Sequence, residues 1–209
     1  MNSFALKILA CILMLIDHIG LVLFPNIIIF RIIGRMAFPI FAWQISIGCK
    51  NSSNFKNYII RLSIFALISQ VPYFLVISPK SLNVFFTLTF GALCIYIYKR
   101  MDNKAVGLFA VCFILIASNG LNVDFGAYGT AMIFLFYLFF ENRLVCIISQ
   151  FIITVLYSTL MLAPLQIYAL MATLPIGLYN GNKGPKAKYL LYVFYPAHLL
   201  VLYFIKLLI

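Results

Sequence analysis

The sequence predicts an all-α membrane protein, a polytopic bundle of transmembrane helices that forms a single domain over residues 1–209. Of the 209 residues, 65% are hydrophobic and only 9% are charged, and the mean hydropathy is +1.10. A soluble domain of this length could not bury that much apolar surface. The apolar runs are long and rarely alternate strictly with polar residues, which favours helices over a transmembrane β-barrel.

The apolar runs divide into about nine predicted spans of roughly 15–22 residues each. Pro25 ends the first run, and Pro79 closes the third. The first run lacks the small-residue cleavage site of a signal peptide, so we expect it to stay in the mature protein. Pro164 either separates two spans or kinks one long helix. The predicted spans are 4–23, 27–48, 59–77, 83–98, 105–118, 126–140, 144–162, 164–179 and 189–208.

The basic residues predict how the chain is oriented. The net charge of +11 would suggest nucleic acid in a soluble protein, but Lys and Arg gather in the cytoplasmic loops of membrane proteins. We therefore expect a cytoplasmic N-terminus, an outer C-terminus, a multi-pass position in the bacterial plasma (inner) membrane, and no nucleic-acid partner. One side holds only Lys80 and Lys206, whereas the other holds eleven basic residues: Lys7, Lys50, Lys56, Arg61, Lys99, Arg100, Lys104, Arg143, Lys183, Lys186 and Lys188.

The apolar stretch LACILMLIDHIGLVLF places Asp17 and His18 inside the first span. His18 lies ~16 Å beyond Lys7 along a helix, near the middle of the membrane. Arg31 and Arg35 enter the second span from the opposite face and reach a similar depth. An ionisable side chain at this depth costs roughly 2.5–3.5 kcal/mol, so it normally faces the bundle interior and finds a partner. We expect Asp17 to pair with one of the arginines.

Adjacent residues on a helix point ~100° apart, so Asp17 and His18 cannot face the same partner. We expect His18 to face a cavity while Asp17 points to a neighbouring helix. Two simpler interpretations remain open: the ion pair only holds helices together, and the two histidines are ordinary packing residues. Several further polar residues reach the same level, from the middle of the membrane to its outer third: Gln70, Tyr73, Asn83, Asp124, Tyr128, Tyr195 and His198.

Six motifs in order make the chain resemble the TraX family, membrane proteins similar to the conjugative-pilin N-acetylase. They are LKILACILMLIDHIG, RIIGRMAFPIFAW, YIIRLSIFALISQVPYFL, LNVFFTL, NVDFGAYG and FYPAHLL, and they run from about Lys7 to Leu200. The segment 141–188 contributes no motif. The family also resembles integral-membrane acyltransferases whose first helix carries a basic residue, ten spacers and a histidine, a spacing that Lys7 and His18 match.

The resemblance implies an acetyltransferase that passes an acetyl group from cytoplasmic acetyl-CoA to an acceptor near the outer side of the lipid bilayer. The acceptor would be the N-terminal amine of an exported peptide or pilin-like protein, or a glycan hydroxyl. His18, Asp17 and Arg35 would be catalytic, and Lys7 and Arg61 would bind the donor. The acceptor side would be lined by Arg31, Gln70, Tyr73, Asn83, Asp124, Tyr128, Tyr195 and His198. The five cysteines show no metal-binding spacing, and we expect no metal.

Two other classes of protein remain as alternatives. A secondary transporter would use the buried His, Asp and Arg side chains as a proton or substrate relay, with prolines marking broken helices. The spans show no internal repeat, which counts against this alternative. A scaffold or immunity-type membrane protein would leave the buried polar cluster without a task. The sequence contains no GxxxxGK[ST], GxSxG or HExxH motif.

Overall fold

The computed structural model describes residues 1–185 and 189–208. Lys186 and Lys188, which the sequence predicts to be cytoplasmic, lie outside the described residues. Within the described part of the chain, the regular structure is helical, and the only strand-like feature is an isolated parallel bridge between Leu82 and Val123. The predicted all-α class is therefore confirmed.

The helices follow the predicted apolar runs closely. Each of the nine runs overlaps one helix or one pair of consecutive helices. In order, the elements are α1 (Ser3–Val22), α2 (Ile28–Gly34), α3 (Ala37–Asn51), α4 (Phe55–Val76), α5 (Val84–Arg100), α6 (Lys104–Gly120), α7 (Gly126–Leu138), α8 (Arg143–Leu160), the 3₁₀ helix η1 (Pro164–Ala172), α9 (Thr173–Gly177) and α10 (Leu190–Leu208).

The number of membrane spans is not confirmed as nine. Among the described residues, five stretches are long and apolar enough to cross a membrane: α1, the α2–α3 run Ile28–Asn51, α4, α8 and α10. The helices α6 and α7 and the run Pro164–Gly177 are apolar but shorter than the roughly 20 residues that a span usually needs. The chain is thus a helical membrane protein with five clear candidates for spanning helices.

Prolines explain a break within one predicted span and the boundary between two others. Pro39 lies in the first turn of α3, where its missing N–H needs no partner, but it cannot continue the hydrogen-bond ladder from α2. The second predicted span is therefore two helices that meet at Arg35 and Met36. Pro164 likewise begins η1 after Leu162, whose φ of 49° ends the preceding helix. Of the two alternatives for Pro164, the separation into two elements is the one observed.

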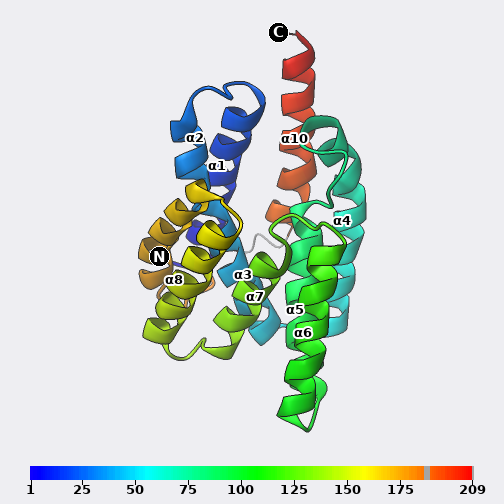
Figure 1. Cartoon of the computed structure of the whole chain (residues 1–209), viewed down its shortest axis with the longest axis vertical. Coiled ribbons are helices and arrows are strands. Elements are labelled where there is room, and N and C mark those ends of the chain that lie inside the picture. Colours follow the sequence, from blue (N-terminus) through cyan, green and yellow to red (C-terminus); the bar gives the residue numbers. More distant parts are fainter. Residues whose placement is uncertain (186–188, 209) are drawn as a thin grey trace.

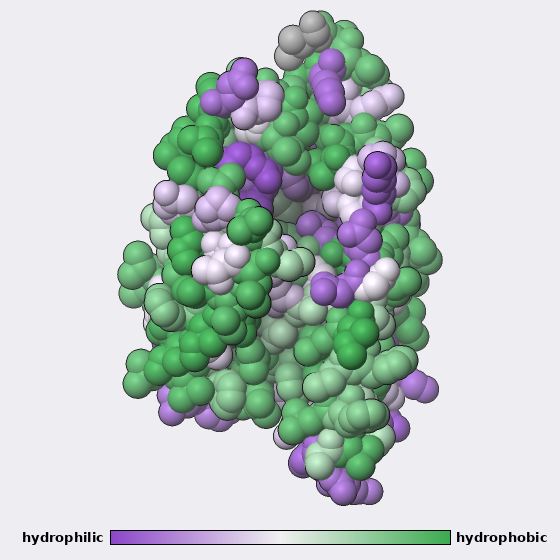
Figure 2. Space-filling model, in the orientation of Figure 1, coloured by the Kyte–Doolittle hydropathy of each residue, from purple (hydrophilic) through white to green (hydrophobic). Residues whose placement is uncertain are grey.

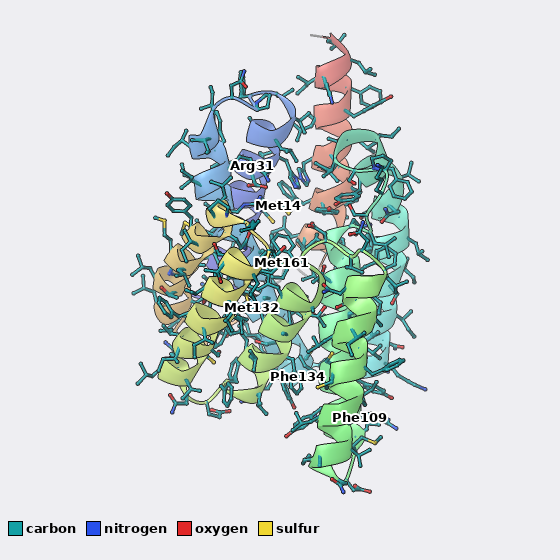
Figure 3. The ribbon with its side chains drawn as sticks, in the orientation of Figure 1. Met14, Arg31, Phe109, Met132, Phe134 and Met161 are labelled. Carbon is teal, nitrogen blue, oxygen red and sulfur yellow. The ribbon has the colours of Figure 1, made fainter. Side chains whose placement is uncertain are left out.

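The first helix lies at the centre of the arrangement that builds the site. α1 packs against α2, α3 and α10, while α3 also contacts α5 and α7 (Figure 1). The core between these helices is apolar; Met132 of α7, for example, is fully buried. Phe109 of α6 points away from the bundle and is 77% exposed, as expected for a side chain that faces lipid (Figure 3).

Charged residues collect at one end of the molecule. Lys50 at the end of α3 forms an ion pair with Glu141 in the α7–α8 connection. Lys56 lies beside Lys99 and Arg100, in a pocket that links the α3–α4 connection to the end of α5. In Figure 2, hydrophilic residues mark this lower end and border a hollow in the upper half, with a hydrophobic surface between them. Lys50, Lys56, Lys99 and Arg100, all predicted to be cytoplasmic, thus lie in two small surface pockets at the ends of α3 and α5.

Candidate functional site

A partly open cavity of about 110 Å³ collects most of the ionisable side chains that the sequence singles out. The lining residues come from α1, α2 and α3 and also from α4, the start of α5, α10 and the α6–α7 connection. Its polar lining consists of Asp17, His18, Arg31, Arg35, Tyr73, Asp124 and Tyr195. His18 therefore faces a cavity, as expected from its position on the first helix.

Asp17 joins both arginines of α2. Its carboxylate accepts hydrogen bonds from Arg35 Nη2 at 2.5 and 2.6 Å and from Arg31 Nη1 at 2.8 Å. Only 9% of the Asp17 side chain is exposed, so the two guanidinium groups compensate a charge that would otherwise be very costly to bury. The expected pairing is present, and it involves both candidate partners at once.

A glycine makes this ion pair possible. A Cβ atom added at Gly34 would lie 2.2 Å from Asp17 Cβ and 2.4 Å from Asp17 Oδ1, far closer than atoms can approach. Gly20 of α1 similarly approaches Phe30 of α2, with an added Cβ only 2.4 Å from Phe30 Cβ. Small residues allow α1 and α2 to pack closely enough for the short arginine contacts.

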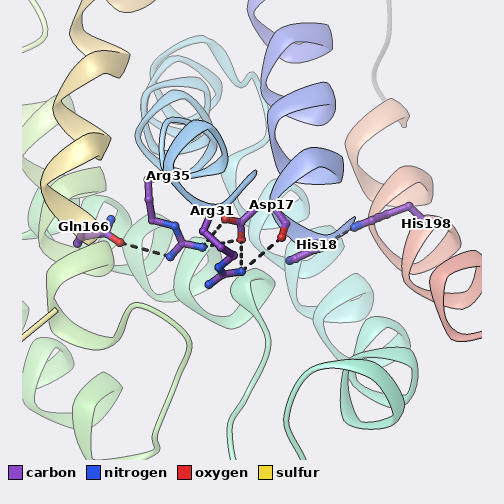
Figure 4. A network of polar contacts seen from close by, with 6 residues as sticks. All are labelled: Asp17, His18, Arg31, Arg35, Gln166 and His198. Carbon is purple, nitrogen blue, oxygen red and sulfur yellow. Dashed lines mark hydrogen bonds and ion pairs between the residues drawn. The ribbon is translucent and has the colours of Figure 1, made fainter. Parts of the chain in front are cut away.

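The His18 side chain leaves α1 in a different direction from that of Asp17 and points toward α10. Its Nδ1 lies 2.7 Å from Nε2 of His198, and Nδ1 of His198 lies 2.8 Å from the carbonyl oxygen of Phe194. Figure 4 shows the consequence of the 100° turn between neighbouring residues: Asp17 faces the arginines and His18 faces His198. His198 is not part of the cavity lining, so its neighbour is His18 rather than the open acceptor side that we expected.

Asp124 reaches the cavity from the connection between α6 and α7. This connection is fixed in place, because the backbone N–H of Asp124 donates to Leu82 at 2.8 Å and its carbonyl accepts from the Thr87 hydroxyl. Burial raises the pKa of the Asp124 carboxyl to about 6, although nearby Arg35 acts in the opposite direction. Its charge therefore changes close to neutral pH.

Two further cavities adjoin the main one. An inner cavity of about 140 Å³ is lined by Lys7 and Arg61, the two predicted donor-binding residues, and it shares Phe41 with the main cavity. A wider pocket of about 390 Å³ shares Arg35, Asp124 and Phe125 with the main cavity. The main cavity thus shares lining residues with two neighbouring pockets, and these two have no lining residue in common.

Besides His198, three further predicted acceptor residues lie outside the main cavity lining. Gln70 and Asn83 bond to each other at 2.7 Å and to nearby backbone atoms, so they join α4 to the start of α5 rather than line the main cavity. Tyr128 bonds to Thr154 at 3.1 Å and also lies outside the main lining. The physical reason is that their side chains turn toward neighbouring helices, a direction that depth along the chain does not specify.

Other residues join the site without having been predicted. Gln166 of η1 accepts a hydrogen bond from Arg35 at 3.5 Å and donates to Tyr128 at 3.3 Å. It comes from the segment in which no motif was recognised. Two other residues that were not predicted, Gly34 and Phe41, do lie within a motif, RIIGRMAFPIFAW. The glycine between the two arginines of this motif could have indicated close helix packing. No group of three or more potential metal ligands occurs among residues 1–185 and 189–208.

Comparison with known proteins identifies the family of this chain. The family model described as TraX protein matches residues 3–206. The chain is 26% identical over 233 residues to the probable fimbrial assembly protein FimC, serogroup H1, of Dichelobacter nodosus, a match that covers 96% of this chain and 94% of that protein. It is also 60% identical over 38 residues to the uncharacterized protein RP591 of Rickettsia prowazekii (strain Madrid E), covering 18% of this chain and 15% of that one. No solved structure matches. The chain belongs to the TraX family.

Proposed function

We propose that this protein is a membrane acetyltransferase that takes the acetyl group of cytoplasmic acetyl-CoA and passes it to an acceptor near the outer side of the bacterial plasma membrane. The observation that carries the proposal is the position of His18, an imidazole that lines a cavity together with two arginines, where this cavity adjoins one pocket lined by Lys7 and Arg61 and a second, wider pocket. Membership of the TraX family and the similarity to a fimbrial assembly protein support an acceptor related to pilin.

The donor would enter along one face of α1. Lys7 and His18 are eleven residues apart, about three helical turns, so their side chains lie on the same face. Lys7 and Arg61 would bind the phosphates of acetyl-CoA, because both are cations beside the inner cavity. The pantetheine arm would pass Phe41, which lines both cavities, and bring its thioester toward His18.

In the main cavity, His18 would act as the general base. As the acceptor nitrogen or oxygen attacks the thioester carbonyl, the imidazole removes the acceptor proton. The tetrahedral oxyanion would be stabilised by Arg35, whose Nε is buried and has no hydrogen-bond partner. When the C–S bond breaks, the thiolate takes the proton back from the imidazolium, leaving free CoA thiol and the acetylated acceptor. In the alternative, His18 itself attacks the thioester, CoA thiol leaves, and the acetyl-histidine then passes its acetyl group to the acceptor.

The acceptor would approach through the opening that Arg35, Asp124 and Phe125 share with the main cavity. As a carboxylate, Asp124 would attract the protonated amine of a peptide N-terminus. This amine must first release one proton to water through the opening, and the neutral amine then attacks the thioester while His18 takes the second proton. Asp17 would act as a positioning residue, since it touches both arginines and holds them at the cavity wall. This arrangement gives His18, Arg35, Asp124 and Asp17 each a task, which a scaffold protein would not require.

The test uses purified protein in lipid nanodiscs with acetyl-CoA and a short peptide whose N-terminus is free. We expect free CoA thiol and acetylated peptide to appear in equal amounts, and a peptide with a blocked N-terminus to remain unreacted. His18→Gln should reduce the rate by roughly 10²–10⁴-fold, the usual contribution of a general base. Phe109→Leu on the exposed face of α6 serves as the matched control and should keep the wild-type rate.

Two results would contradict the proposal. One is full activity of the His18→Gln protein. The other is a wild-type protein that neither binds acetyl-CoA nor releases thiol with peptide or glycan acceptors. A protein that carries an intact substrate across the membrane without chemical change would instead be a transporter.

A further inference from the structure

We infer that His198 is a positioning residue that fixes the tautomer of His18, through a chain of hydrogen bonds that ends on the Phe194 carbonyl of α10. This inference rests on the proposed function for its catalytic meaning, but the hydrogen-bond pattern can be tested without any activity. It assigns His198 a role different from contact with the acceptor.

The Phe194 carbonyl, where this series of hydrogen bonds ends, determines which atom is the donor in each of them. A backbone carbonyl can only accept, so Nδ1 of His198, 2.8 Å from the Phe194 oxygen, must carry a proton. In a neutral His198, Nε2 then has a free lone pair and can only accept. Nδ1 of His18, 2.7 Å away, must therefore be the donor. The remaining nitrogen of a neutral His18, Nε2, is left unprotonated.

The geometry fits a direct hydrogen bond within one plane. The two imidazole rings are 3° from parallel, and their centroids are 5.0 Å apart. A ring-stacking contact would not bring two nitrogens within 2.7 Å at that centroid distance, whereas two rings that point their nitrogens at each other would. Phe194 stacks on His198 at 4.8 Å and 14°, which restricts rotation of that ring. His198 is 6% exposed, so water has little access to compete for the bond.

The neutral state of His198 follows from its surroundings. Its ring lies between the Phe194 ring and the edge of Tyr195, with no carboxylate among its described contacts. Asp17, the acidic residue next to His18 in the chain, is already occupied by both arginines. A cation at His198 would therefore be buried without an anionic partner, which is strongly unfavourable.

The chain of hydrogen bonds has a direct chemical consequence. A general base needs a free lone pair aimed at the substrate, and the chain leaves that lone pair on Nε2 of His18. When Nε2 takes a proton from the acceptor, the Nδ1–H bond to His198 strengthens, because its donor has become charged. A neutral imidazole thus performs the orienting task that a carboxylate performs in a Ser-His-Asp triad.

The test is nitrogen NMR of histidine-labelled protein in lipid, at a pH where both rings are neutral. The protein contains only two histidines, so the spectrum holds two imidazoles, and His198→Gln leaves the signals of His18 alone. We expect Nδ1 to be protonated and Nε2 bare in both rings of the wild type. The side-chain amide oxygen introduced by His198→Gln can replace Nε2 as the acceptor, so His18 should keep its tautomer in this variant.

His198→Leu removes the acceptor while keeping an apolar side chain, so His18 should lose its fixed tautomer and its Nε2 should become partly protonated. The rate of thiol release should fall roughly 100-fold in His198→Leu, as for a misplaced catalytic group, and should be largely restored in His198→Gln. The KM for acetyl-CoA should be unchanged in both, because the donor-binding residues line another cavity.

Each outcome has a clear meaning. A bare Nδ1 on His18 in the wild type, or an unchanged tautomer in His198→Leu, would overturn the inference even if the protein proves to be an acetyltransferase. The expected tautomers in a protein without acetyl transfer would support the hydrogen-bond chain while contradicting the proposed function. A thermal unfolding curve for each variant excludes loss of the fold as the reason for a changed spectrum.

Discussion

Gly34→Ala tests the packing on which the whole site depends, because it changes no charge. The added methyl group would lie 2.2 Å from Asp17 Cβ and 2.4 Å from Oδ1, whereas ordinary contacts begin near 3.4 Å. Asp17 and α2 must therefore separate by about 1 Å. The arginine contacts of 2.5–2.8 Å would then stretch beyond hydrogen-bonding distance or require α2 to shift as a whole.

The expected magnitude follows from these two possibilities. Overpacking alone costs roughly 1–3 kcal/mol, and breaking a buried ion pair costs about 3–5 kcal/mol. We expect a loss between these limits in the free energy of unfolding, measured by denaturant titration in mixed micelles. The rate of acetyl transfer should fall on the order of 100-fold, because an arginine displaced by about 1 Å no longer meets the oxyanion.

Gly120→Ala provides the matched control. A Cβ added at Gly120 meets no atom within 4 Å, so this variant should differ from the wild type by less than about 0.5 kcal/mol. If Gly34→Ala were as stable and as active as Gly120→Ala, α1 and α2 could not approach as closely as described. The account of how Asp17 holds both arginines would then fail.

Four other predictions address the remaining groups. Asp17→Asn should cost up to about 3–5 kcal/mol in the free energy of unfolding, because it leaves two partly buried arginines, whose side chains are 22% and 15% exposed, without an anion; an unchanged denaturation midpoint would refute this. Lys7→Gln together with Arg61→Gln should raise the KM for acetyl-CoA at least ~10-fold with little change in kcat. An unchanged KM would show that acetyl-CoA does not bind at the cavity lined by these two residues. The KM for a peptide amine should fall as the pH rises through about 6, where Asp124 loses its proton, and Asp124→Asn should abolish this dependence. The pKa of Asp124 in the folded protein is raised from 3.8 to about 6, so the free energy of unfolding should decrease as the pH rises from about 4 to 6. If Asp124→Asn left the plot of unfolding free energy against pH unchanged in this range, the raised pKa would be contradicted.

From the sequence, the depth of each polar residue along its helix was easier to predict than the direction in which its side chain points around the helix axis. The rise per residue places Asp17, Arg31 and Arg35 at one level, and the requirement that a buried charge be paired then predicts their contact. Gln70 and Asn83 were also expected to line the acceptor side, but they turn toward each other and the local backbone. Rotation and lateral neighbours depend on how helices pack, and a single sequence does not specify that packing.

The contacts between distant segments were the least predictable part of the site. His18 and His198 are 180 residues apart, and their direct hydrogen bond depends on α1 and α10 being neighbours. Gln166 reaches Arg35 from a 3₁₀ helix in a segment without a recognised motif. The span count of nine is likewise not confirmed, because the apolar runs of α5, α6 and α7 form helices of only 13–17 residues, shorter than the roughly 20 that a span usually needs.

The most direct test of the central claim, that chemistry takes place at His18 between a cytoplasmic donor and an outer acceptor, is a measurement of sidedness. Protein is reconstituted into sealed vesicles, with acetyl-CoA only on the side of the Lys7 and Arg61 cavity and a free-amine peptide only on the other. The account predicts acetylated peptide on its own side, CoA thiol on the donor side, and neither product with His18→Gln. Acetylation that requires both substrates on the same side, or passage of intact acetyl-CoA to the peptide side, would contradict the account.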